Sequence, residues 1–201
     1  AELPVTKPGA FGSLRFLAQV RRTFLVCEGA TGLEVLDQHA VDERILYHRM
    51  RASLAARRVE VQRLLFPERI ELSVEEVERA EARADEFAAA GLECSRIGPT
   101  TLAIHTVPSL LARARPARLA QDLLAELAHE GDRSFGDALD TAVATMACHA
   151  AIRAGDELSP AECQALLRSL DEVDAFAGHC PHGRPVVTTL AWTELEKKLG
   201  R

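Results

Sequence analysis

The stretches FLAQVRRTFLVCE at residues 16–28 and LEVLD at 33–37, with the segment that follows them, decide the fold. Both stretches are short and rich in Val, Leu and Phe. They are separated by Gly29–Gly32, which predicts two strands joined by a turn. Apolar residues then recur at helical spacing over residues 39–57, so a helix is expected there. Two strands that lead directly into a helix indicate a mixed architecture.

The rest of the chain continues this mixed order. Ser73, with Glu76 three residues later, fits a capping box, and Ser159-Pro160 places a capping residue before a proline that suits a first helical turn. The expected helices cover residues 73–90, 116–130, 135–154, a segment from 159 and 193–199, and the expected strands cover 59–72 (broken at Pro67), 94–107 and 186–190. The fold class is therefore α+β.

Length and composition narrow the class of protein. The chain has 201 residues, 47% of them hydrophobic and 27% charged, which suits a globular protein of one large domain or two lobes. No apolar run reaches the ~20 residues that span a bilayer, and no secretory leader precedes the first strand. Neither a membrane protein nor a secreted one is therefore expected. Residues 1–13, which contain two prolines and two glycines, are expected to be a linker remnant of a longer protein.

Net charge bears on nucleic-acid binding, and the cysteine count bears on metal binding. The 24 basic and 30 acidic residues give a net charge of −6, so tight binding of nucleic acid by overall electrostatics is not expected. Any contact with double-stranded DNA would be weak and local, or would depend on a partner. The five cysteines are an odd number in a chain without a leader, which favours metal binding or catalysis over a disulfide framework.

The sequence DQHAVDE at residues 37–43 is the first candidate site. His39 and Glu43 are four residues apart and would share one face of the helix, with Asp37 at its start. An imidazole and two carboxylates that converge there can hold a divalent cation. Equally, acidic residues at a helix start interact favourably with the helix dipole without binding a metal. The residues alone leave both interpretations open.

The sequence CPHGRP at residues 180–185 is the second candidate site. Its Cys-x-His pair, in a loop restricted by proline and glycine, presents a thiolate and an imidazole together, and zinc accepts both. Cys148, beside His149 in an apolar helical segment, could supply a third ligand. The alternative is that these cysteines pack as small hydrophobic residues and that Arg184 forms an ion pair.

The chain resembles the C-terminal domain of MutL DNA mismatch repair proteins in three motifs taken together. These are DQHA at 37–40 with Glu43-Arg44, Ala147-Cys148, and CPHGRP at 180–185. The resemblance covers about residues 14–201, and both the order and the spacing of the motifs agree with that family.

The resemblance implies a two-lobed domain that forms a homodimer. A dimerisation lobe of residues 14–60 and 135–201 would carry the metal site. Residues 61–134 would form an external, regulatory lobe inserted between its two parts. A bacterial protein in the cytoplasm, associated with the nucleoid and working with MutS, is expected.

The resemblance also implies a latent endonuclease that nicks duplex DNA with the help of metal ions. The residues that would bind structural or regulatory Zn²⁺ are Glu43, Cys148, Cys180 and His182. A second, catalytic ion such as Mn²⁺ would lie near Asp37 and His39, so the expected catalytic residues are Asp37, His39 and Glu43.

Two positions depart from the family pattern. His48 stands where a second glutamate is usual, and His149 stands where an arginine or lysine follows the cysteine. Imidazole can replace a carboxylate as a ligand with loss of charge, and a histidine binds phosphate less well at neutral pH. These departures keep a second interpretation open, a non-catalytic zinc-binding dimerisation and scaffold domain. An unrelated zinc hydrolase is a weaker alternative.

A third motif is QRLLFP at residues 62–67. It is similar to peptides that bind a sliding clamp, in which a glutamine amide and apolar side chains enter a groove in an extended conformation. The residues assigned to clamp binding are Gln62, Leu64, Leu65, Phe66 and Pro67. The alternative is an ordinary, partly buried strand that ends at the proline.

Overall fold

Arg21 and Arg22 divide the first predicted strand into two. Both have positive φ angles, 54° and 49°, and Thr23 N–H donates to Val20 O at 3.1 Å. They therefore form a tight hairpin turn whose twist suits antiparallel strands. The prediction of one strand over 16–28 is wrong, because such turns usually carry Asn or Gly and two arginines give no turn signal.

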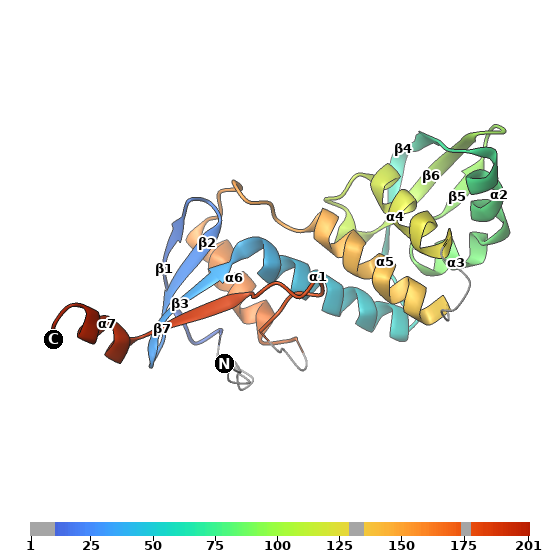
Figure 1. Cartoon of the computed structure of the whole chain (residues 1–201). Helices are drawn as coiled ribbons and strands as arrows, with labels where there is room; N and C mark the ends of the chain where they lie inside the picture. The colour runs from blue at the N-terminus through green and yellow to red at the C-terminus, as the bar shows by residue number, and fades with distance from the viewer. Residues whose placement is uncertain (1–10, 129–134, 174–177) are drawn as a thin grey trace. The chain divides into compact units, whose positions relative to one another are not determined.

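The computed structural model describes residues 11–128, 135–173 and 178–201, and it divides into two units (Figure 1). The first unit comprises residues 1–48 and 152–201, and the second comprises residues 49–151. The predicted boundaries at 60/61 and 134/135 differ from this division. Helix α1 (Gln38–Ala55) passes from the first unit into the second.

The first unit contains a four-stranded antiparallel sheet in the order β1-β2-β3-β7. Its further elements, besides the start of α1, are β1 (Arg15–Val20), β2 (Phe24–Glu28), β3 (Gly32–Asp37), α6 (Pro160–Leu170), β7 (Val187–Ala191) and α7 (Trp192–Lys198). Leu25, Cys27 and Leu36 on one face of the sheet are fully buried and pack in one core with residues of α1 and α6. This packing holds the start of α1 against the sheet.

The second unit contains a three-stranded antiparallel sheet in the order β4-β6-β5. Its elements, besides the end of α1, are β4 (Val61–Glu71), α2 (Val74–Ala82), α3 (Ala84–Ala89), β5 (Cys94–Arg96), β6 (Thr101–Pro108), the 3-10 helix η1 (Ser109–Leu111), α4 (Pro116–Ala128) and α5 (Phe135–Ala150). Buried leucines of α4 and residues of β6 form much of its core. No helix in the described ranges is long and apolar enough to cross a bilayer.

The mixed α+β class is confirmed, as are both helix starts. Ser73 with Glu76 and Ser159 with Glu162 form reciprocal capping boxes at the starts of α2 and α6. The helix predicted over 135–154 ends earlier, at Ala150. Beyond this end, the Ile152 N–H donates to the Asp42 carboxylate at 2.9 Å instead of to a helix carbonyl.

The start of the chain is partly described. Of the segment predicted to be a linker, residues 1–10 lie outside the described residues. Phe11 is buried in the core of the first unit. The backbone N–H groups of Phe11 and Gly12 donate to the Asp171 carboxylate at 2.9 and 2.6 Å. The loop predicted at 131–134 also lies outside the described residues.

Candidate metal centre

Asp37 is the capping residue of α1. Its Oδ1 accepts the backbone N–H groups of His39 at 2.9 Å and Ala40 at 3.1 Å. Aspartate is favoured at this position because its side chain accepts N–H groups that have no partner within the helix. The cap sets the direction in which α1 leaves β3, and so determines where the residues of its first turns point.

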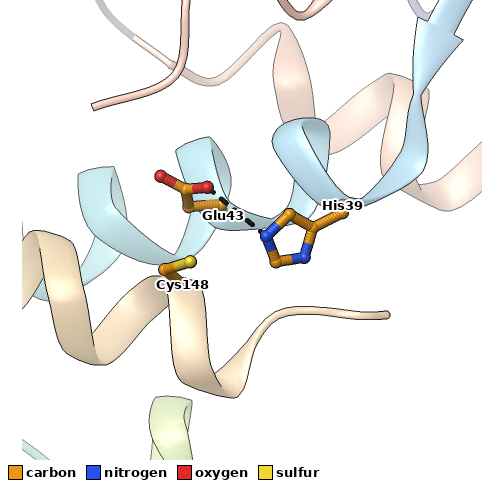
Figure 2. Close-up of side chains that lie close together, drawn as sticks. All are labelled: His39, Glu43 and Cys148. Atoms are coloured by element: carbon orange, nitrogen blue, oxygen red, sulfur yellow. Dashed lines mark ion pairs between the residues drawn. The ribbon is translucent and has the colours of Figure 1, made fainter. Parts of the chain in front are cut away.

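Glu43 is a buried carboxylate between two imidazoles. The residue is only 1% exposed. His182 Nδ1 donates to Glu43 Oε1 at 2.6 Å. His39 Nε2, one helical turn earlier on α1, lies 3.6 Å from Glu43 Oε2 (Figure 2). Burying a carboxylate is costly unless charged or hydrogen-bonding groups compensate for lost water. The hydrogen bond from His182 provides part of that compensation here, and a cation would provide more.

The loop after α6 brings Cys180 and His182 to this carboxylate. Cys180 N–H donates to Arg184 O and Gly183 N–H donates to Cys180 O, each at 2.9 Å, so the chain folds into a tight turn. Gly183 has a φ of +79°, which favours glycine at this position. The ligand atoms of Glu43, Cys180 and His182 all lie within 4.8 Å of one another.

The Cys180 thiol is buried within this turn. Its pKa is raised, chiefly by burial and also by the nearby Glu43 carboxylate, while backbone hydrogen bonds at Arg184 and His182 act in the opposite direction. Backbone donors to sulfur stabilise a thiolate, the form that binds metals. Thiolate, imidazole and carboxylate together are the ligand types that zinc prefers, so the residues of the first unit fit a zinc ion.

A family of known domains matches most of the chain. The family model described as the MutL C terminal dimerisation domain matches residues 17–158. The chain belongs to this family. The resemblance seen in the sequence is thereby confirmed. The matched residues include the motif at 37–43 and Ala147-Cys148, whereas CPHGRP at 180–185 lies beyond them.

Individual relatives agree with this membership. The chain is similar to proteins named DNA mismatch repair protein MutL from Anaeromyxobacter dehalogenans (42% identity over 195 residues, 96% of this chain and 32% of that protein) and Rhodopseudomonas palustris (44% over 185 residues, 91% and 31%). A third relative of that name, from Azotobacter vinelandii, is 40% identical over 194 residues, which is 96% of this chain and 30% of that protein. The chain thus spans about a third of the length of these curated relatives.

The remaining predicted ligand is Cys148, and the two residues that depart from the MutL pattern are His48 and His149. Cys148 is a half-buried residue of α5, in the second unit (Figure 2). His48 is the last residue of α1 that belongs to the first unit. His149 Nδ1 donates to the Asp122 carboxylate at 2.6 Å within the second unit. Asp122 also pairs with Arg118, so His149 is engaged in a polar cluster around the buried Asp122 of this MutL-family domain.

The predicted clamp-binding residues lie in a bulge of β4. The β4–β6 ladder is interrupted at residues 64–67, where four residues of β4 oppose one residue of β6. Leu65 is 89% and Phe66 is 80% exposed, whereas Leu64 is half-buried. Gln62 is exposed in the ladder just before the bulge. An ordinary strand would bury alternate apolar residues, so the bulge presents these side chains to solvent instead.

Sequence reasoning gave no role to two buried polar residues of the first motif. Gln38 is fully buried, and its Nε2 donates to the carbonyl oxygens of Arg22, Arg153 and Asp156 at 2.9–3.1 Å. Asp42 is 6% exposed and accepts the Ile152 N–H. In the sequence, these roles are indicated only by a polar residue at a helix position that faces the core. Their partners are backbone groups far along the chain, which no local pattern reveals.

Proposed function

We propose that this chain is the C-terminal domain of a mismatch repair MutL and is a metal-dependent endonuclease that nicks duplex DNA. The observation that carries the proposal is Glu43, a carboxylate that is 1% exposed and lies against His39, His182 and Cys180. A carboxylate buried among side chains of the types that bind metals would be stabilised by a bound cation.

The proposed ligands follow from this cluster. Zn²⁺ would be held by Glu43, Cys180 and His182 of the first unit, and the family resemblance names Cys148 as a further ligand. Asp37 and His39 would hold a second ion, Mn²⁺. Bound divalent ions supply an activated water and neutralise charge on the phosphodiester. The chain's own contribution is to hold the two carboxylates and the imidazole of α1 in place, through the Asp37 cap and the core contacts of α1.

A supercoiled plasmid tests the proposal. The purified chain with Mn²⁺ should convert the plasmid to open circles, faster when its sliding clamp is loaded on the DNA. No conversion with or without the clamp would reject the endonuclease.

A zinc-binding scaffold is the second candidate function, and three contacts favour it. Asp37 Oδ1 is engaged as a helix cap, His39 Nδ1 bonds Ile152 O at 2.8 Å, and His149 bonds Asp122. Each residue therefore has a structural role that does not need catalysis. A chain that binds zinc but never nicks DNA would have this second function.

The outer face of the first unit's sheet supports a homodimer. Residues paired across adjacent strands share a face, and Ala18, Val26, Val35 and Thr188 form one such row. Val20 and Phe24 pair on the same face and are 42% and 38% exposed. An open apolar face of this kind is typical of an interface, which agrees with the dimerisation named in the family description.

The Val26→Arg variant should therefore be a monomer. A charge in the middle of the face would be buried without a partner in the dimer, which weakens association by several kcal/mol. Sedimentation of the wild type and the variant at equal concentration measures this. Val61→Arg, at an apolar residue of β4 that is 45% exposed, is the matched control and should stay a dimer. A dimeric Val26→Arg variant would place the interface elsewhere.

The bulge of β4 supports clamp binding. Because the chain has a net charge of −6, it needs a partner to reach DNA, and a sliding clamp, together with MutS at the bacterial nucleoid, would provide that delivery. Leu65 and Phe66 in the bulge are available to fill an apolar groove.

The Leu65→Ala, Phe66→Ala double variant should lose stimulation by the clamp and keep its basal nicking. We expect at least about tenfold weaker clamp affinity, since exposed anchor residues dominate such interfaces, and a change in stability below about 0.5 kcal/mol. Clamp affinity and plasmid nicking are measured in parallel. Ile97→Ala, at another exposed apolar residue of the second unit, is the control. Undiminished clamp affinity in the double variant would contradict the assignment.

A further inference from the structure

Two side chains of α1 bracket a single backbone residue, Ile152. Its N–H donates to Asp42 Oδ2 at 2.9 Å, and its carbonyl oxygen bonds His39 Nδ1 at 2.8 Å. All of these residues belong to the first unit. The backbone of Ile152 is therefore held on both sides of its Cα, in two consecutive peptide groups, by residues less than one helical turn apart.

The carbonyl of Ile152 determines the tautomer of His39. A carbonyl oxygen only accepts hydrogen bonds, so Nδ1 must carry the proton. In the neutral imidazole, Nε2 then presents its lone pair. That atom faces Glu43 Oε2 at 3.6 Å (Figure 2). Two lone-pair atoms that face each other at this distance are stabilised by a cation between them.

The segment that supplies this carbonyl is held by further side chains of the same motif. Gln38 Nε2 donates to Arg153 O and Asp156 O, and Gln19 Nε2 donates to Asp156 O at 2.9 Å. Asp42 holds the Ala151–Ile152 peptide group, whereas the next group, which carries the Ile152 carbonyl, is held by the Arg153 N–H, which donates to Asp156 Oδ2 at 2.8 Å. Asp42 is 6% exposed, so its hydrogen bond is shielded from water and fixes the backbone on the N-terminal side of the Ile152 Cα, which limits how the carbonyl on the other side can turn.

We propose that Asp42 is a positioning residue, which acts through Ile152 to present His39 Nε2 toward Glu43 as a metal ligand. The metal-binding part rests on the proposed function. Partners that orient a ligating histidine typically change metal affinity about 10–100-fold when they are removed. Asp42 is one step further from the metal, so a loss of about tenfold in Mn²⁺ affinity is expected.

Nitrogen chemical shifts of selectively labelled histidines test the proposal. At alkaline pH, where imidazoles are neutral, His39 of the wild-type chain should show the Nδ1–H tautomer. The Asp42→Ala variant should show a mixture of the two tautomers, and the Asp42→Asn variant, whose amide oxygen still accepts the Ile152 N–H, should restore the single one. Binding of Mn²⁺ alone, followed by electron paramagnetic resonance, should weaken about tenfold in Asp42→Ala and recover in Asp42→Asn.

The outcomes separate the two proposals. An Nε2–H tautomer in the wild type, or a tautomer and Mn²⁺ affinity unchanged in Asp42→Ala, would overturn the positioning role. Loss of tautomer and affinity together without rescue by Asn would also overturn it, because a general disturbance of the fold explains that result. A wild-type chain that shows the expected tautomers and Mn²⁺ affinities but does not nick DNA would reject the endonuclease and leave the positioning role standing.

Discussion

Nicking of supercoiled plasmid by the Asp37→Asn variant is expected to fall at least about 100-fold below that of the wild-type chain. Asp37 Oδ1 caps α1 through the N–H groups of His39 and Ala40. Asparagine caps helices about as well as aspartate, so the variant keeps the cap and loses the negative charge. A carboxylate that holds a catalytic cation fails when that charge is removed, whereas a simple cap does not.

The chain offers a matched control in Asp171→Asn. Asp171 is another aspartate of the first unit whose carboxylate accepts two backbone N–H groups. Its substitution removes the same charge and leaves the proposed metal ligands untouched, so nicking should persist. The melting temperature and the dimer mass are measured for both variants. Equal nicking by Asp37→Asn and the wild type would remove Asp37 from the catalytic residues.

The second large effect is expected on the zinc content of the purified protein. The wild-type chain should retain about one zinc ion per protomer after dialysis against chelator-free buffer, and the Cys180→Ala variant should retain almost none. Removing the thiolate leaves Glu43 and His182 as the remaining ligands of the first unit within the cluster. Metal analysis of the purified proteins gives the stoichiometry directly.

Cys163→Ala separates ligation from packing. Cys163 and Cys180 are both buried in the hydrophobic core of the first unit, and burial raises the pKa of both thiols. Truncation to alanine removes a similar volume at each position. Zinc should therefore stay with Cys163→Ala and leave with Cys180→Ala. Equal zinc content in the two variants would show that Cys180 is a packing residue.

The two experiments together distinguish the two candidate functions. Zinc that depends on Cys180, with nicking that depends on Asp37, supports an endonuclease in spite of His48 and His149. Zinc that depends on Cys180 without any nicking supports a scaffold. His149, which pairs with Asp122, would then be one reason why the chain does not nick DNA.

Local signals were sufficient for most of the secondary structure. The capping boxes at Ser73 and Ser159 and the apolar periodicity of α1 are properties of residues a few positions apart, and the structure has helices at all three places. The hairpin turn at Arg21-Arg22 was not predicted. Its positive φ angles are supported from outside the segment, because Arg22 O accepts hydrogen bonds from Gly155 N–H and Gln38 Nε2.

The proposed clamp-binding segment is a second feature whose conformation depends on residues outside it. The sequence QRLLFP allowed both a buried strand and a presented peptide. Only the register of β4 against β6 distinguishes them, because it places four residues opposite one and leaves Leu65 and Phe66 in solvent. Register depends on pairing with a strand about forty residues later, which no local pattern encodes.

The sequence by itself determined the α+β class, the family and the identity of the ligand-type residues, because these depend on residue type and short spacing. The tertiary structure decided that Glu43 is buried against His182, 139 residues away. It also decided that Ile152 orients His39. Each of these facts depends on segments distant in the chain that meet only when the core closes, since hydrogen bonding and burial are properties of the folded surroundings.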